Sequence, residues 1–150
     1  IKVSALILAN ILYGQSSVTF QTFMNPAIPG DHPDSTLSRI DNEFYTTGLS
    51  FNLIPVIFDS TYLVHWEAIA QPVSAAWTNY GNSPAGGCCG IQVVYYNDKY
   101  WHFFSRAGQM YFVTADDIRG SWTMATLIKR PSVVPGLSYN NSIFVDNDSS

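Results

Sequence analysis

Short apolar and aromatic segments alternate with polar turns along most of the chain, and this pattern occurs twice. The distance from Phe44 to Trp66 equals that from Tyr100 to Trp122, 22 residues in each case, so a turn, aromatic strands and a closing tryptophan recur in step. The first copy comprises residues 40–47, 56–60 and 63–69, and the second comprises residues 96–104, 110–117 and 120–123. Each copy predicts three or four short strands separated by turns, and a third copy begins at residues 142–146.

The length of the repeat indicates the fold. The copies begin 56 residues apart, slightly more than the roughly 40 to 50 residues usual for a blade of a β-propeller. A four-stranded blade cannot bury both of its faces alone, so several blades pack around an axis. We therefore predict an all-β fold, a β-propeller of which about two blades and the start of a third are present. For the repeated tryptophans, Trp66 and Trp122, core packing is favoured over ligand binding.

Composition supports this fold class and excludes one class of partner. The chain is 47% hydrophobic and 15% aromatic but only 12% charged, which favours a folded domain rich in strands over a disordered segment. The net charge is −4, so no basic field is present to hold a phosphate backbone. Nucleic acid is therefore excluded as an expected partner.

The first 17 residues have the features of a secretory signal. One cation, Lys2, precedes the short apolar run 3–12, and the small and polar stretch 14–17 follows. We expect residues 1–17 to be a signal peptide, residues 18–150 to form an incomplete propeller catalytic domain, and the protein to be extracellular. A buried strand or helix is the alternative for the apolar run, which is too short to span a bilayer. Because the chain starts at Ile1 and stops in a polar turn, we expect it to be the front part of a longer protein.

Two cysteines and three histidines show no pattern of a metal site. Cys88 and Cys89 are adjacent, and adjacent cysteines form a disulfide only with a distorted peptide bond. His32, His65 and His102 have none of the spacings of zinc ligands. We predict neither a structural disulfide nor a metal site from these residues.

The densest polar cluster occupies residues 30–36, just before the first strand of the first copy. Inner strands of a propeller begin near its central channel, where side chains of several blades converge. A carboxylate in this cluster, such as Asp31 or Asp34, can therefore reach a ligand. Aspartate, serine and proline are also common turn residues, and these residues alone favour an ordinary acidic turn.

The order of several motifs resembles a known family of enzymes. The run Asn25–Ser35, followed by residues 44–51 and 63–66, is similar to the opening of glycoside hydrolase family 43. Residues 112–117 and 120–122 continue the resemblance, which extends from Thr22 to the end of the chain. It implies a five-bladed propeller that acts on oligosaccharides or polysaccharides as a β-xylosidase, α-L-arabinofuranosidase or arabinanase.

The resemblance assigns roles to four positions. Asp34 matches the general base that activates water, although Ser35 stands where the family usually has proline. Asn140 occupies the place of a second aspartate, which in the family tunes the pKa of the general acid. Cys89 stands where a tryptophan often lines the sugar pocket, and Phe51 matches an aromatic residue near that pocket, with core packing an equal alternative.

The general acid of the family is a glutamate in a later blade, beyond this chain. The family inverts the anomeric centre, which requires both carboxyl groups, so we expect these 150 residues alone to be inactive. No cofactor is implied, and the sequence neither indicates nor excludes a bound calcium ion. The alternative function is a degenerate propeller that binds plant polysaccharide without cleaving it, a reading prompted by Asn140, Cys89 and Ser35.

Overall fold

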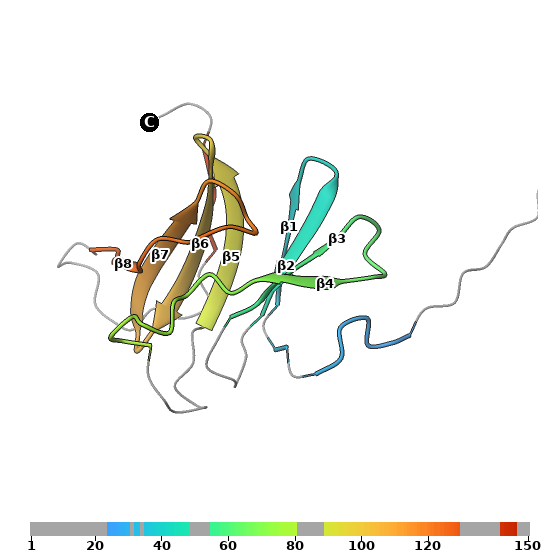
Figure 1. Ribbon diagram of the computed structural model, residues 1–150, viewed down its shortest axis with the longest axis horizontal. Helices are drawn as coiled ribbons and strands as arrows, with labels where there is room; N and C mark the ends of the chain where they lie inside the picture. Colours follow the sequence, from blue (N-terminus) through green and yellow to red (C-terminus); the bar gives the residue numbers. More distant parts are fainter. Residues whose placement is uncertain are drawn as a thin grey trace, which may run out of the picture.

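The computed structural model describes residues 24–30, 32, 33, 35–48, 55–80, 89–129 and 142–146. Its strands form two four-stranded antiparallel sheets, in which neighbours in the sequence are neighbours in the sheet (Figure 1). The first sheet, blade 1, contains β1 (Thr36–Ile40), β2 (Glu43–Thr47), β3 (Ile57–Ser60) and β4 (Glu67–Ala70). The second sheet, blade 2, contains β5 (Cys89–Tyr96), β6 (Lys99–Arg106), β7 (Gln109–Ala115) and β8 (Thr126–Leu127). Among the described residues, no helix is long and apolar enough to cross a membrane.

The hairpin turns explain why the strands begin and end where the repeat predicted. Asp41, between β1 and β2, has a φ of 55°, and Asn97 and Asp98, between β5 and β6, have φ angles of 50° and 57°. Asparagine and aspartate tolerate this left-handed backbone better than other residues with a side chain, and tight hairpins require it. The predicted turns at the start of each copy are therefore confirmed.

The fourth strand of each blade is shorter than the repeat pattern suggested. In blade 1, residues 61–65 form bends and β4 begins only at Glu67. In blade 2, the hydroxyl Oγ1 of Thr123 accepts the backbone N–H of Thr114 at 2.9 Å. A side chain thus takes the place of a backbone carbonyl in the ladder, and residues 120–123 stay irregular until β8 starts at Thr126.

One part of the core lies between the two blades. Tyr45 and Ile57 of blade 1 pack with Val93 and Ile118 of blade 2, and all four are almost completely buried. The two sheets therefore stabilise each other through apolar contact, as successive blades of a propeller do.

A second part of the core forms under the connection between the blades. Residues 71–80 follow β4 and place Trp77 edge-on against Phe104 and Tyr111, with ring centroids 5.7 and 4.8 Å apart. This connection covers one face of blade 2.

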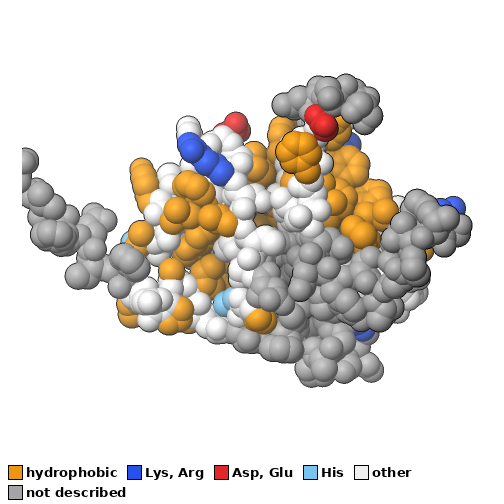
Figure 2. Space-filling model, turned by 180° about the vertical axis from the view of Figure 1, so that it is seen from behind, with side chains coloured by type: hydrophobic (Ala, Val, Ile, Leu, Met, Phe, Trp, Pro, Cys, Tyr) orange, Lys and Arg blue, Asp and Glu red, His pale blue; other side chains and the backbone are white. Residues whose placement is uncertain are grey.

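Seen from behind, hydrophobic side chains gather at the surface over each sheet (Figure 2).

The repeated tryptophans have different surroundings. Trp122 packs against both core clusters, as predicted. Trp66 belongs to neither cluster; it lines a polar pocket, where its indole N–H donates to the carbonyl of Leu63 at 3.2 Å. For Trp66 the prediction of core packing was wrong: residues 61–65 form bends in place of a strand, and the partly exposed ring of Trp66 lines the polar pocket.

Candidate active site

The loop that carries the predicted base is held on both sides of position 34. The hydroxyl of Ser35 donates to the carbonyl of His32 at 2.8 Å, a bond that spans the intervening residues. The ring of His32 donates from Nε2 to the carbonyl of Pro29 at 3.2 Å and lies edge-on to Phe58, with ring centroids 5.3 Å apart. The loop is therefore anchored to β3 of blade 1, and β1 begins immediately after it.

The end of β2 packs closely under the same loop. A Cβ atom at Gly48 would lie 2.9 Å from Oγ of Ser35 and 3.3 Å from the carbonyl oxygen of Pro33. Both distances are shorter than ordinary van der Waals contact, so a side chain at this point would displace Ser35 and the loop by a few tenths of an ångström. Gly48 thus allows the loop to lie directly against blade 1.

Three of the four predicted site residues, Asp34, Phe51 and Asn140, lie outside the described residues. Of Cys89 the structure describes the backbone, which begins β5 opposite Ser105 of β6. The structure does describe the neighbours of these positions in the chain: Pro33 and Ser35 flank position 34, and Ser142 follows position 140 by two residues.

The fold brings the starts of the first strands of the blades together. β1 and β5 lie side by side and run in the same direction, with their starts at the lower edge of the view in Figure 1. Next to β5 lies the segment 142–146, where the N–H of Ile143 donates to the side-chain oxygen of Gln92 at 2.6 Å. Positions 34 and 89 therefore precede or open neighbouring strands at one end of the blades.

A second polar site lies at the opposite end of blade 1, and the sequence analysis did not identify it. Ile40 pairs with Glu43, whereas Thr36, next to the loop, pairs with Thr47, so Glu43 and the base loop are at opposite ends of the β1–β2 hairpin. The pocket here has a volume of about 480 Å³. We call it the polar pocket. Its lining comprises Glu43, Tyr45, Asp59, Ser60, Thr61, His65, Trp66, Glu67 and Arg119.

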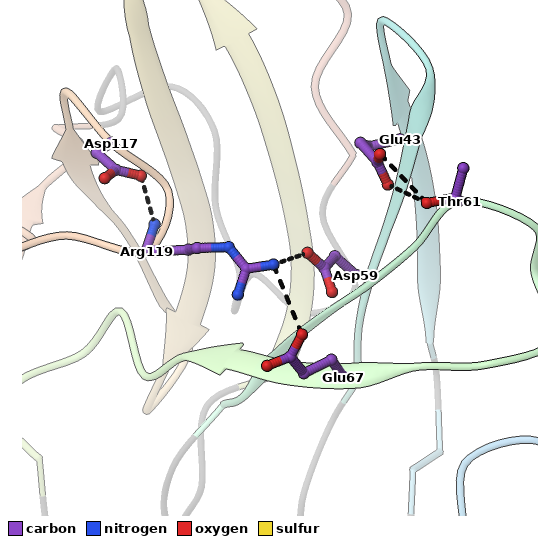
Figure 3. A network of polar contacts seen from close by, with 6 residues as sticks. All are labelled: Glu43, Asp59, Thr61, Glu67, Asp117 and Arg119. Atoms are coloured by element: carbon purple, nitrogen blue, oxygen red, sulfur yellow. Dashed lines mark hydrogen bonds and ion pairs between the residues drawn. The ribbon is translucent and has the colours of Figure 1, made fainter.

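Charged groups of both blades meet in the polar pocket (Figure 3). Arg119 of blade 2 reaches from the end of β7 to Asp59 of blade 1, and the same Nη2 atom lies 3.8 Å from the carboxylate of Glu67. Burial raises the pKa of Asp59, and the neighbouring Arg119 opposes that shift. The hydroxyl of Thr61 donates to both carboxylate oxygens of Glu43, at 3.1 and 3.3 Å.

No local signal in the sequence could have found this pocket. Its residues come from β2, β3, the connection between β3 and β4, β4 and the segment after β7. Apart from Trp66, which the repeat pattern assigned to the core, they are polar residues with no distinctive spacing. Among the described residues, no group of three or more histidine, cysteine, aspartate or glutamate side chains could hold a metal ion.

Comparison with known proteins identifies similar sequences. Residues 23–150 match the family described as Glycosyl hydrolases family 43. The non-reducing end α-L-arabinofuranosidase of Bacteroides ovatus is 26% identical over 144 residues, covering 89% of this chain and 27% of that enzyme. The β-xylosidase of Bacillus subtilis is 25% identical over 137 residues, covering 83% of this chain and 25% of that enzyme. The chain thus spans about a quarter of the length of the curated relatives it matches.

Solved structures share the fold. The family 43 protein BlXynB of Bacillus licheniformis has a TM-score of 0.66 at 22% identity, covering 84% of this chain and 27% of that chain. The xylan β-1,4-xylosidase of Bacillus halodurans has a TM-score of 0.61 at 24% identity, covering 71% of this chain and 23% of that chain. These similarities confirm the predicted fold, in which the two described sheets are blades of an incomplete propeller.

Proposed function

The chain belongs to glycosyl hydrolase family 43, and from this membership we propose that its protein cleaves glycosidic bonds in xylan- or arabinan-derived sugars. The relatives named above include an α-L-arabinofuranosidase and a β-xylosidase, which supports these two activities. The substrate is a neutral oligosaccharide or polysaccharide, and the reaction takes place outside the cell.

We assign the role of general base to Asp34. The observation that carries this assignment is the anchored loop: the bond from Ser35 to the carbonyl of His32 spans position 34, and β1 begins immediately after it. Serine replaces proline at position 35, and its hydroxyl bond tethers the turn at the place where a proline ring would have restricted it.

The chemistry proposed is a single displacement with inversion. Asp34 takes a proton from water while the water oxygen attacks the anomeric carbon, and a general acid protonates the leaving oxygen. The two carboxyl groups of an inverting enzyme are roughly 6.5 to 9.5 Å apart, which leaves room for the water. By the family resemblance the acid is a glutamate of a later blade, so catalysis needs chain beyond these 150 residues.

The test is hydrolysis of the 4-nitrophenyl β-xyloside and α-L-arabinofuranoside by the protein produced from its complete reading frame. Asp34→Asn is expected to lower kcat by at least about a thousandfold, because the base is lost while the loop keeps its shape. Asp31→Asn is the matched control, since it removes the same charge from the same loop and is expected to keep most of the activity. Equal losses in both variants would argue against Asp34 as the base.

A second variant separates an enzyme from a binding protein. Asn140→Asp restores the charge that the family resemblance expects, and a carboxylate there favours the protonated form of a nearby acid. We expect kcat to rise at least about tenfold, and the optimum of the pH–rate profile to move toward higher pH. If a folded complete protein shows no turnover with either residue at position 140, but still binds xylan, a polysaccharide-binding function replaces this proposal.

A further inference from the structure

The polar pocket contains hydrogen-bonding groups that the described residues leave unused. Tyr45 is 7% exposed and lines the pocket; its hydroxyl makes no hydrogen bond to the described residues and is not among their fully buried unpartnered polar atoms. The hydroxyl therefore reaches the surface of the pocket. It can donate to a ligand there without giving up a bond to the protein.

Donors and acceptors both remain open around Tyr45. Toward the carboxylates of the described residues, Arg119 uses only Nη2 of its guanidinium, which leaves most of its five N–H groups for other acceptors. Among the described residues, the carboxylate of Glu43 accepts from a single hydroxyl, that of Thr61, and it has capacity for about three more bonds. A ligand that satisfies the pocket must offer donors and acceptors together.

The aromatic and ionic lining narrows the ligand class. Trp66 supplies an apolar ring, which is held by the bond from its indole N–H to Leu63, and small-molecule sites combine such rings with a few placed polar groups. A metal ion does not fit, because Arg119 places a positive charge in the pocket and the described residues provide no metal-binding group. Vicinal hydroxyl groups on a ring with an apolar face fit all of these features.

We propose that the polar pocket is a second carbohydrate-binding site, which takes one or two units of a neutral oligosaccharide. Its volume of about 480 Å³ lies within the range of small-molecule sites. Glu43 and Glu67 accept bonds from sugar hydroxyls, Arg119 and Tyr45 donate to sugar oxygens, and Trp66 covers the apolar face of a ring.

The site is separate from the proposed catalytic centre. It lies at the opposite end of the β1–β2 hairpin from the base loop, and every residue of its lining comes from blades 1 and 2. A polysaccharide bound in the polar pocket is held against the enzyme, and its bound units lie away from the proposed catalytic centre.

The probe is xylotriose, a choice that rests on the proposed function, and the readout is the ¹⁹F resonance of Trp66 in protein labelled with 5-fluorotryptophan. Trp66→Phe assigns the resonance. We expect millimolar xylotriose to shift it in a saturable manner, and Glu43→Gln and Tyr45→Phe each to raise the dissociation constant about five- to tenfold, as the loss of one hydrogen bond does. Asp116→Asn is the matched control: it removes the same charge as Glu43→Gln from an exposed carboxylate of blade 2 paired with Lys99, and is expected to bind as the wild type.

Each result decides the proposal. A shift of the Trp66 resonance that persists in Asp34→Asn, which lacks turnover, supports the second site independently of the catalytic assignment. If the complete protein has no turnover but the resonance still shifts, the proposed function fails and the second site is supported. Three results overturn it: no shift of the Trp66 resonance, a shift that Glu43→Gln and Tyr45→Phe leave unchanged, or a shift produced by calcium chloride and not by xylotriose. Trp66→Phe only assigns the resonance, so a folding defect in that variant does not affect the binding test. The test depends on Glu43→Gln and Tyr45→Phe, which keep the shape of the side chain.

Discussion

At position 102 the chain buries a histidine completely between aromatic rings. His102 is 0% exposed, stacks on Phe104 with ring centroids 5.8 Å apart, and meets the edge of Trp122 at 6.2 Å. Neither of its ring nitrogens has a hydrogen-bond partner among the described residues. A charged imidazolium cannot be solvated there, so burial lowers its pKa from 6.5 to about 3.

This burial predicts an acid-sensitive fold. The unfolded chain takes up a proton at position 102 below about pH 6.5, whereas the folded chain stays neutral until about pH 3. Stability is therefore complete above pH 6.5 and falls toward acid, by about 2 kcal/mol between pH 7 and pH 5. Urea unfolding at these two values measures the loss, and His102→Leu is expected to remove that contribution.

The matched control is His65→Leu, which changes an exposed histidine and should keep the acid loss of the wild type. Other groups that titrate, such as Asp59, whose pKa burial raises, contribute equally to all three proteins. An identical loss of stability in the wild type and in His102→Leu would mean that the histidine is hydrated or charged in the folded state.

At the scale of single elements, the base loop depends on the close approach of β2. Because a Cβ atom at Gly48 would meet the loop at 2.9 and 3.3 Å, Gly48→Ala is expected to displace residues 32–35. A displacement of about 1 Å at a catalytic group can lower the rate about a hundredfold. We therefore predict a 10- to 100-fold loss of kcat/KM on 4-nitrophenyl glycosides, measured on the complete protein, with a loss of stability of about 1 kcal/mol.

Gly120→Ala is the control for this prediction. A Cβ atom at Gly120 would lie 3.2 Å from the carbonyl oxygen of Asp117, a similar crowding far from the base loop. This variant should lose stability but keep kcat/KM. If both variants lose activity in proportion to their stability, the effect of Gly48→Ala is general and the loop has no special dependence on that residue.

Elements built from local patterns could be predicted from the sequence, and those built from distant contacts could not. The turns at Asp41 and at Asn97 follow from residue type and alternation alone. The short fourth strand of blade 2 does not follow from these local signals, because the hydroxyl of Thr123 replaces a backbone partner of Thr114. The place of the loop before the first strand was anticipated, but the hydrogen bonds of Ser35 and His32 that anchor it were not. The polar pocket joins Glu43 to Arg119, residues that only the packing of two blades brings together.

At the scale of the whole molecule, Arg119 joins the two blades by ion pairs to Asp59 and Glu67. The side chain of Asp59 is only 14% exposed, and Arg119 of blade 2 is its charged partner. Removing the arginine leaves a mostly buried carboxylate without compensation, so Arg119→Met is expected to cost about 1 to 3 kcal/mol. Adding Asp59→Asn to Arg119→Met should recover part of this loss in urea unfolding, and a simple sum of the two single effects would show that the pair is not coupled.

The outward face of blade 2 predicts how these 150 residues behave when produced alone. Trp101 stacks on Phe103, and Phe112 contacts both rings, whereas the opposite face of the same strands packs in the core. Together with residues 143–146, Trp101 and Phe103 line a groove of about 420 Å³. A terminal blade of a soluble repeat protein normally has a polar outer face, so this aromatic surface requires a covering partner.

We therefore predict that the isolated 150-residue chain self-associates at micromolar concentration through this aromatic face. Light scattering after size exclusion should show dimers or larger species, and Phe103→Thr, which keeps the preference for strand, should shift them toward monomer. Tyr62→Thr is the control, because Tyr62 is 81% exposed and lies outside the face. A monomer at all concentrations, or an equal effect of both substitutions, would mean that the chain itself covers the face, whereas a monomeric complete protein beside an associating isolated chain would assign the covering role to a further blade.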